Sequence, residues 1–432
     1  MKPLTIRYLI PLTGLFAFAG FLSNLSAEDS PDKQSIESPE CPLNGPSDAL
    51  KCALNRNPEV LHARMRFQES QATKDIADNV PNPSLAGQYM FSSGEAELEY
   101  RHVIELGDRR ELRTREADAE IRLRALELEM ARQDTILSTV MALYQLEHIQ
   151  EELKYLNETI QAFNAAIYRL YRLPSRDANQ NTSLFTYLMA RDSLRQQKLE
   201  AQDRWNQIRR NLEVKLGRSL DDQDLSRIAA GHPQKWPAIS EDFGKSLEQA
   251  HASQEVSRAT YSHRLESSRI WPDITIGPRI SLQKSQSGGF YSRERSSKEL
   301  GLSFSVTLPL YNQYTGEQDR ARAREHSSEI QKERTDRGIQ SEYRYIVRSY
   351  RQHVSGLKTS PTMRILEGRR YAVLGYLRRG LLSPALLVEF HRTYGEHVHQ
   401  YHAAQLRALS MLWRSYALTG RILDEEIIES IK

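Results

Sequence analysis

The sequence predicts an α+β membrane protein whose chain folds as two similar structural repeats, with four strands in all and very long helices. Three features support this prediction: an apolar run at the N-terminus, helical segments far longer than a compact domain needs, and short segments in which apolar and polar residues alternate. We therefore expect a protein that is exported and partly embedded in a membrane.

The N-terminus has the pattern of a secretory signal peptide. Lys2 and Arg7 supply positive charge at the start of an apolar run, and Ala27 is a small residue at a plausible cleavage point. The apolar run is too short to span a bilayer comfortably. We predict a signal peptide over 1–27, followed by a poorly ordered segment over 28–45 that is rich in Ser, Pro, Asp and Glu.

Charge and motif content argue against several functions. The chain has 59 basic and 56 acidic residues, which are interspersed and form no basic stripe of the kind that binds nucleic acid. It has no HExxH motif, no Gly-rich phosphate loop after a strand and no nucleophile elbow, so we expect neither an enzyme nor a cofactor. No apolar run of about 18 residues follows the signal, so entry into a membrane would require β-strands.

Cys41 and Cys52 are the only cysteines of the chain. An exported protein meets an oxidising compartment, where paired cysteines become disulfides. We therefore predict a disulfide that closes a small N-terminal loop, in preference to metal ligation by the two thiols.

The chain repeats its plan once. PNPSL in the first half and WPDI in the second begin strand-like segments, and SLFTYLMARDSL from Ser183 stands 200 residues before SPALLVEFHRTY from Ser383. Such self-similarity at a long period indicates a duplicated architecture. We predict repeats over 46–230 and 231–432, joined at the Pro- and Gly-containing stretch 231–237.

The first repeat contains a predicted helix from about Asp108 to Arg172, because this stretch has no Pro or Gly and is dominated by good helix formers. A returning helix is predicted from about Leu184 to Leu216. In the second part of the first helix, apolar residues are alternately three and four positions apart, which is the 3.5-residue period of a coiled coil. These residues are Leu146, Ile149, Leu153, Leu156, Ile160, Phe163, Ile167 and Leu170.

The second repeat has matching predicted helices, from about Gly316 to Arg378 and from Pro384 to Thr419. Pro361 lies inside the first of them and should kink or break it, because proline removes a backbone donor and clashes with the preceding turn. At about 1.5 Å per residue these helices extend well beyond the needs of a compact domain, so we expect their length to serve the function.

Two pairs of strands are predicted from residues that alternate between an apolar and a polar face. The pattern fits either a sheet covered by a helix or the wall of a membrane barrel. Pro278 should mark a bulge or a strand start, because a barrel has no free edge at which to place a missing donor. The apolar positions are Leu85, Tyr89, Phe91, Leu98, Tyr100, Ile104, Ile274, Ile276, Ile280, Leu282, Leu300, Leu302, Phe304, Val306 and Leu308.

Four strands are too few to close a barrel, since even small barrels need about eight. A transmembrane β-barrel would therefore have to be shared between protomers, so the sequence predicts oligomerisation. The loops near 92–96 and 283–298 are expected at the outer end of the strands.

Four motifs occur in a fixed order: DALKCALNRNPEVLHAR, PNPSL, ELGDRRELR and LSFSVTLPLYNQYTGEQDRARA. Together they resemble the outer-membrane efflux (TolC-like) family over about residues 46–420. The resemblance implies a homotrimer with a twelve-stranded barrel in the outer membrane of a Gram-negative-type bacterium and a periplasmic coiled-coil barrel of helices. It implies a passive efflux channel that works with a periplasmic adaptor and an inner-membrane pump.

The ELGDRR motif looks most like the branch of the family that serves heavy-metal cation efflux. Efflux or secretion of drugs and other small molecules by the same fold is the alternative. A periplasmic adaptor is a further alternative, because adaptors also contain helical hairpins. Two helical hairpins interleaved with two β-hairpins argue against it.

The resemblance also implies that the periplasmic tips of the helical hairpins contact the adaptor through an Arg-x-Gly-Leu-x-Ser pattern. The second tip, LRRGLLSP, has this pattern, and a simple helix turn without a partner is the alternative. The first tip departs from it, because PSRDANQNT replaces the glycine turn. The predicted contact residues are Arg378, Gly380, Leu381 and Ser383 at the second tip and Arg172, Leu173 and Ser183 at the first.

Members of the family place acidic residues beyond the second tip, where they gate the pore. Glu389 stands at one such position and Leu386 at another, so a ring of Glu389 side chains would attract cations. A solvated surface residue is the alternative. The histidines of this helix could suggest a metal, but no nearby Cys or carboxylate completes a ligand set, so we expect packed or solvated histidines and no metal site. These are His391, His397, His399 and His402.

Overall fold

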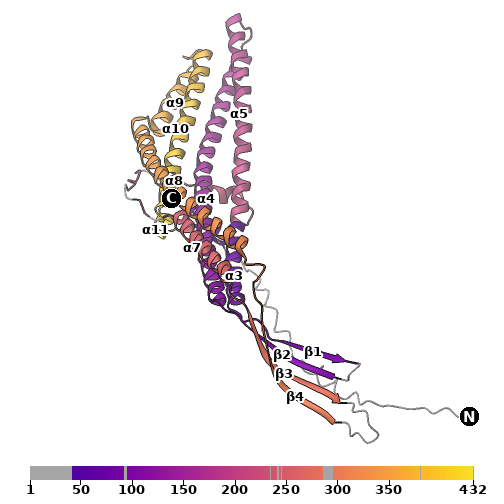
Figure 1. The fold of residues 1–432 in the computed structure, drawn as a ribbon. Helices are drawn as coiled ribbons and strands as arrows, with labels where there is room; N and C mark the ends of the chain where they lie inside the picture. The colour runs from indigo at the N-terminus through magenta and orange to yellow at the C-terminus, as the bar shows by residue number, and fades with distance from the viewer. Residues whose placement is uncertain are drawn as a thin grey trace, which may run out of the picture. The chain divides into compact units, whose positions relative to one another are not determined.

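Two long helical hairpins and a four-stranded sheet dominate the fold (Figure 1). The computed structural model describes residues 41–432 except for 92–94, 234, 241–242, 245, 286–294, 380 and 432. The described residues belong to one compact unit that begins at Cys41. The predicted signal peptide and most of the predicted disordered segment lie outside them.

The two halves have the same order of elements: a helix, two strands and then a long helical hairpin. In the first half these are α3 (Pro58–Asp78), β1 (Ser84–Met90), β2 (Glu95–Ile104), α4 (Arg109–Tyr171) and α5 (Ala178–Leu216). In the second half they are α7 (Leu247–Ser268), β3 (Ile274–Ser285), β4 (Arg295–Val306), α8 (Thr315–Thr359), α9 (Met363–Arg378) and α10 (Pro384–Leu418). Shorter helices complete the fold: α2 (Pro46–Arg56), α6 (Asp222–Ile228) and α11 (Glu425–Glu429).

The long helix α4 confirms the predicted helix to within one residue at each end. Its heptad residues pack against α5, α9 and α10, as a coiled-coil seam should. The predicted start of α5 was wrong by six residues. The helix begins at Ala178, because the carboxylate of Asp177 accepts a hydrogen bond from the backbone N–H of Gln180 at 2.7 Å and the Gln180 side chain accepts one in return.

The break at Pro361 is confirmed, since α8 ends at Thr359 and α9 begins at Met363. The first arm of the second hairpin is therefore divided into α8 and α9, and α10 returns along both of them. Ser383 is the N-cap of α10 and accepts a hydrogen bond from the backbone N–H of Leu386 at 3.4 Å, with Pro384 at the first helical position.

The largest apolar core lies where the long helices meet the short ones. Side chains of α4, α5 and α10 pack there against α2, α6 and α11, and Leu50, Leu143, Leu212 and Leu409 are fully buried. Cys41 and Cys52 form a disulfide at the edge of this core, with their Cα atoms 5.6 Å apart. Cys52 is itself buried, so the bond holds the start of the described chain against α2 and α5.

The four strands form one antiparallel sheet in the order β1-β2-β3-β4. The register places the predicted apolar residues on the same face: Leu85 pairs with Tyr100, Leu98 with Ile280, and Ile280 in turn with Leu300. Because side chains alternate along a strand, the opposite face carries most of the serines and charged residues, whereas Lys298 lies opposite Leu282 on the apolar face. The predicted alternation is thus confirmed as two chemically distinct faces.

Pro278 marks neither a bulge nor a strand start, so that prediction was wrong. β3 runs through Pro278, which pairs with Leu302 of β4, and the register with β2 is the same on both sides of it. The pairing with β2 lapses only opposite Gly277 and Pro278, where proline has no N–H to donate. The sheet therefore accommodates the proline by omitting two pairs.

The loops at the outer end of the strands are shorter than predicted. β2 already includes Glu95 and Ala96, β3 extends to Ser285, and β4 begins at Arg295. The remaining parts of both predicted loops lie outside the described residues. The strands extend into the predicted loops because their last residues still pair with the neighbouring strand, Met90 with Glu95 and Ser285 with Arg295.

We predict that Gly277→Ala disrupts the sheet and that Gly301→Ala, on the same polar face, is tolerated. A Cβ at Gly277 would lie 1.6 Å from the carbonyl oxygen of Tyr100, whereas a Cβ at Gly301 meets nothing within 4 Å. The backbone at Tyr100 cannot move aside as a side chain can. We therefore expect Gly277→Ala to lower the free energy of unfolding by about 3 kcal/mol, which is the upper end of the range for overpacked sites. Denaturant unfolding of both variants measures this difference, and equal effects would contradict it.

Candidate functional site

One face of the sheet is an exposed apolar surface. Leu300, Leu302 and Phe304 of β4 are 81%, 89% and 69% exposed. Monomeric soluble proteins rarely expose a contiguous apolar area of this kind, so it indicates a surface that another apolar phase or molecule covers. Further members of this apolar face are Leu85, Tyr89, Leu98, Tyr100, Ile104, Ile276, Ile280 and Leu282.

The opposite face of the sheet is polar. Arg279 on β3 binds Glu97 on β2 at 2.7 Å, and Arg101 binds Glu99 along the same strand at 2.7 Å. Ser303 of β4 donates a hydrogen bond to the carbonyl of Gly277 at 3.1 Å. Charged residues with described side chains on this face are Glu95, Glu97, Glu99 and Glu299 against Arg101 and Arg279, so acidic groups are in excess.

The ELGDRR motif forms the junction between sheet and helices. Gly107 has a φ of 73° and lies against the ring of Trp271, where a Cβ would come within 2.4 Å of the indole. Arg109 donates a hydrogen bond to the carbonyl of Trp271 at 3.3 Å and forms an ion pair with Asp273. The motif thus joins the start of α4 to the start of β3. Its remaining charges act locally: Glu105 pairs with Arg113, and Arg110 donates to the carbonyl of Asp78.

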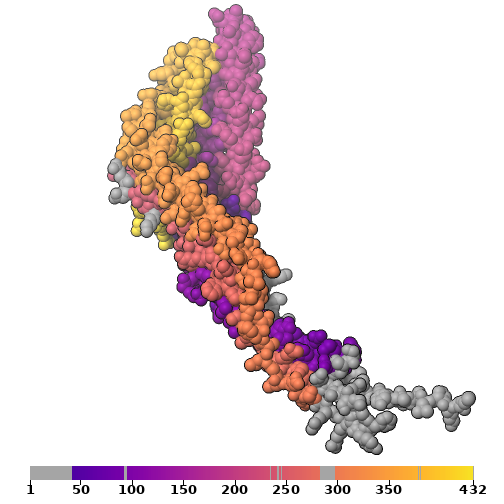
Figure 2. Space-filling model, in the orientation of Figure 1, coloured from indigo at the N-terminus to yellow at the C-terminus, as the bar shows by residue number. Residues whose placement is uncertain are grey.

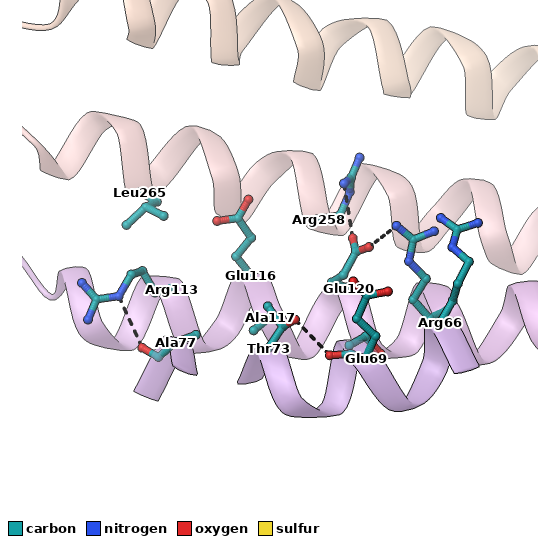
Figure 3. A pocket seen from close by; sticks show the side chains of 12 residues that line it. Arg66, Glu69, Thr73, Ala77, Arg113, Glu116, Ala117, Glu120, Arg258 and Leu265 are labelled. Atoms are coloured by element: carbon teal, nitrogen blue, oxygen red, sulfur yellow. Dashed lines mark hydrogen bonds and ion pairs between the residues drawn. The ribbon is translucent and has the colours of Figure 1, made fainter. Parts of the chain in front are cut away.

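A hollow of about 590 Å³ lies between α3, α4 and α7 near this junction (Figure 3). Glu120 of α4 is at its centre and binds Arg124 at 2.6 Å and Arg258 of α7 at 3.2 Å. Arg66 of α3 reaches Glu127 at 3.6 Å. The charges around the hollow are therefore joined in a network that ties three helices together, which is a structural role.

The tip of the first hairpin places the predicted contact residues unequally. Arg172 and Leu173 lie at the end of α4, with the Arg172 guanidinium 4.6 Å from the centre of the Tyr168 ring. Ser183 is not part of the tip loop. It lies inside α5, where its hydroxyl donates to the carbonyl of Asn179 at 2.7 Å, because the Asp177 cap starts the helix earlier than expected.

The second tip presents an exposed apolar side chain beside a helix cap. Leu381 is 67% exposed, and Ser383 caps α10. Gly380 lies outside the described residues, and Arg378 is the last residue of α9. The two hairpins are tied together just before their tips, since Arg169 of α4 donates to the carbonyl of Leu377 of α9 at 3.4 Å.

An arginine that the sequence analysis missed joins the two hairpins below the tips. The side chain of Arg370 on α9 is only 3% exposed and binds Glu158 of α4 at 2.5 Å. The rings of Tyr155, Tyr371 and Tyr394 surround its guanidinium, with centres 4.9 to 5.9 Å away. Such cation–π contacts stabilise a desolvated cation. Its partner Glu158 stands 212 residues earlier, so no local pattern in the sequence reveals the pair.

Glu389 lies on the exposed side of α10 and is paired along its own helix. Arg392 binds Glu389 at 2.6 Å and Glu396 at 2.6 Å. The hydrogen bond from Arg392 lowers the pKa of the Glu389 carboxyl, which is therefore charged. Its negative charge is partly balanced by Arg392 within the chain.

The histidines of α10 divide into a buried pair and an exposed pair. His391 and His402 are buried, whereas His397 and His399 are exposed. His402 stacks on His148 of α4 with ring centres 4.2 Å apart, and its Nε2 lies 3.0 Å from the carboxylate of Glu151. Among the described residues, no group of three or more His, Cys, Asp or Glu side chains is arranged to hold a metal.

Burial keeps His391 of α10 and His148 of α4 neutral. Desolvation lowers the pKa of His391 to about 4, with a further contribution from the charge of Arg370. Desolvation, with repulsion from His402, lowers the pKa of His148 to about 3. The half-buried Glu147 shifts in the opposite sense, since burial raises the pKa of its carboxyl to about 7.

The arrangement of two helical hairpins beyond a small antiparallel sheet defines a known class of structures. No family model and no curated protein sequence matches the chain. Solved structures match it along most of its length. CusC, whose structures concern transmembrane channel formation, has a TM-score of 0.65 at 13% identity and covers 87% of this chain and 92% of its own.

Two outer-membrane channels are similar to the same degree. The CmeC channel of Campylobacter jejuni has a TM-score of 0.67 at 12% identity, over 87% of this chain and 86% of CmeC. The open state of the MtrE channel of Neisseria gonorrhoeae has a TM-score of 0.65 at 15% identity, over 88% of this chain and 90% of MtrE. The fold of this chain is therefore the fold of these outer-membrane channels. No helix in the described part of the chain combines the length and apolar character of a bilayer span.

We predict that removing His391 reduces the loss of stability in acid. Unfolded imidazoles bind protons near pH 6.5, whereas folded His391 does so only near 4, so acid favours the unfolded chain. When the pH falls from 7.5 to 5.5, the free energy of unfolding should decrease by about 1 kcal/mol more in the wild type than in His391→Phe. The raised pKa of Glu147 opposes this trend equally in both proteins and cancels in the difference.

Urea unfolding at the two pH values measures this difference. His397→Phe is the matched control, because it makes the same replacement at an exposed histidine of the same helix. Identical pH dependence in the wild type and His391→Phe would contradict the prediction.

Proposed function

We propose that the chain is one protomer of a homotrimeric outer-membrane channel in a tripartite efflux system. The observation that carries this proposal is the sheet, whose apolar face is exposed and whose edge strands β1 and β4 each pair on one side only in the described part of the chain. Three copies would join edge to edge into a twelve-stranded barrel, with lipid against the apolar face and the polar face around the pore. The similarity to the CmeC and MtrE channels supports this arrangement.

The helices would then form a periplasmic tunnel that continues the barrel. The coiled-coil seam of α4 with α5 and α10 supports this role, because it gives a rigid extended wall. The tips would meet a periplasmic adaptor, and an inner-membrane pump would drive transport. The channel itself would be a passive duct for cargo.

We propose heavy-metal cations as the cargo, with drugs or other small molecules as the alternative. Among the described side chains of the polar face, the excess of acidic over basic groups favours cations over anions in the pore. The ELGDRR motif adds little to this choice, since its described side chains serve the junction of sheet and helices. Metal sensitivity of a strain that lacks the protein distinguishes the two cargoes, because a drug channel would leave metal tolerance unchanged.

Purification gives the direct test of the channel proposal. The protein should require detergent for extraction, have the mass of three chains and conduct ions in a planar bilayer. A water-soluble monomer would refute it and would favour a periplasmic adaptor instead. The adaptor alternative predicts no conductance at any voltage.

We propose that the contact of Arg370 with Glu158 holds the hairpins in their closed arrangement. Opening by a small sliding of α9 and α10 against α4 would separate the two side chains. Arg370→Ser should therefore raise the conductance of the reconstituted channel. A loss of about 1.4 kcal/mol of closed-state stability would raise the open population roughly tenfold.

Arg369→Ser is the matched control, because Arg369 is the adjacent residue on α9 and is exposed. Its conductance should equal that of the wild type. Equal conductance of the wild type and Arg370→Ser would exclude the Arg370 contact as part of the gate. The role proposed for Glu389 is tested in the same assay by Glu389→Gln, which should reduce cation selectivity.

We predict that Leu381→Asp weakens adaptor binding without changing the trimer. Leu381 is an exposed apolar side chain at the second tip, and a charge there would oppose its burial by a partner. Co-purification of cross-linked adaptor and export from cells measure the effect. Leu199→Asp is the control, since Leu199 is an exposed leucine on α5 away from the tip. Loss of binding by both variants, or by neither, would contradict the assignment of the tip.

A further inference from the structure

A hollow of about 340 Å³ lies between α4, α5 and α10, below the tips of the hairpins. Tyr155 and Phe163 of α4 and Leu194 of α5 form apolar walls, and His391 of α10 faces the same space. Arg392 lines its rim and carries the ion pair with Glu396. Its volume falls within the range of small-molecule sites, which bury apolar ligand surface against aromatic side chains and orient it with a few polar groups.

His391 is the unusual feature of this hollow. Its side chain is 4% exposed, and neither of its ring nitrogens has a hydrogen-bond partner among the described residues. The rings of Phe163 and Phe390 lie 5.4 and 5.5 Å from the imidazole, measured between centres. Buried polar groups in native proteins are nearly always hydrogen-bonded, so an imidazole left unpaired beside a hollow points to a ligand.

The tyrosine and the two arginines nearest to His391 are already committed to other partners. Tyr155 donates its hydroxyl to the backbone carbonyl of His391 at 3.0 Å. Arg392 is held by Glu389 and Glu396, and Arg370 by Glu158. A ligand in the hollow therefore meets apolar rings and one imidazole, and the polar part of the lining also includes Ser193 and Gln197 of α5 and the ion pair of Arg392 with Glu396.

We propose that this hollow binds a neutral, planar aromatic molecule that carries a hydroxyl or N–H group, with His391 as its hydrogen-bond partner. A neutral imidazole offers one donor and one acceptor, which match a phenol or an indole. Aromatic walls favour a planar ring in offset or edge-to-face contact. A charged ligand is disfavoured because the two charged residues that line the hollow, Arg392 and Glu396, already neutralise each other. The bound molecule would contact three helices of the two hairpins at once.

The test uses 2-naphthol and the full-length protein in amphipol, with binding measured by calorimetry. We expect saturable binding of one molecule per chain. Naphthalene, which lacks the hydroxyl, should bind at least tenfold more weakly. A site built around a hydrogen bond rejects an analogue that lacks the matching group.

Two variants should each weaken binding at least tenfold. His391→Phe removes the hydrogen-bond partner. Gly395→Leu fills the hollow without altering His391, since a Cβ at Gly395 already lies 3.5 Å from the Tyr155 hydroxyl. His402→Phe is the matched control: it removes another buried histidine of α10, which lines a separate hollow of about 320 Å³. It should bind 2-naphthol within twofold of the wild type.

Thermal melting of each variant without ligand establishes that it is folded. The proposal is overturned if 2-naphthol binds His391→Phe and the wild type equally, or if His402→Phe loses binding to the same extent as His391→Phe. It is also overturned if naphthalene and 2-naphthol bind equally, because the imidazole would then play no part.

Discussion

The exposed apolar face of the sheet is the constraint on which the rest of the structure depends. Fully burying one leucine or phenylalanine side chain is worth about 1.5–3 kcal/mol, and β4 alone exposes Leu300, Leu302 and Phe304. No helix in the described part of the chain covers them. In the proposed channel, lipid would cover these side chains, and edge-to-edge pairing of β1 and β4 between copies would satisfy their unpaired backbone groups.

The helical end of the molecule is organised by a different interaction. The seams of α4, α5 and α10 are apolar, and α9 adds the charged contact of Arg370 with Glu158 to its own apolar contacts. An apolar seam tolerates small sliding, whereas an ion pair surrounded by aromatic rings has one favourable geometry. Together with the break at Pro361, this is why we propose α9 and α10 as the segment that moves when the channel opens.

The ELGDRR motif lies at the junction of the sheet and the helices, so it indicates the fold and does not indicate the cargo. Gly107 allows the close approach of Trp271, and Arg109 reaches across to the start of β3. These contacts fix where α4 leaves the sheet, so the proposed channel would need them whatever its cargo. In that proposal, residues that select cargo are to be sought on the polar face of the sheet and among the tips.

The sequence by itself determined the helix lengths, the break at Pro361, the four strands and their apolar and polar faces, because these follow from local periodicity and from proline chemistry. It misplaced the start of α5, which the side chain of Asp177 caps, and it predicted a bulge or a strand start at Pro278, where the ladder with β2 omits two pairs. Only the tertiary structure brought Arg370 to Glu158 and left His391 unpaired beside a hollow. Those contacts join segments more than 200 residues apart, and the partners of a buried polar group are decided by packing that no local pattern encodes.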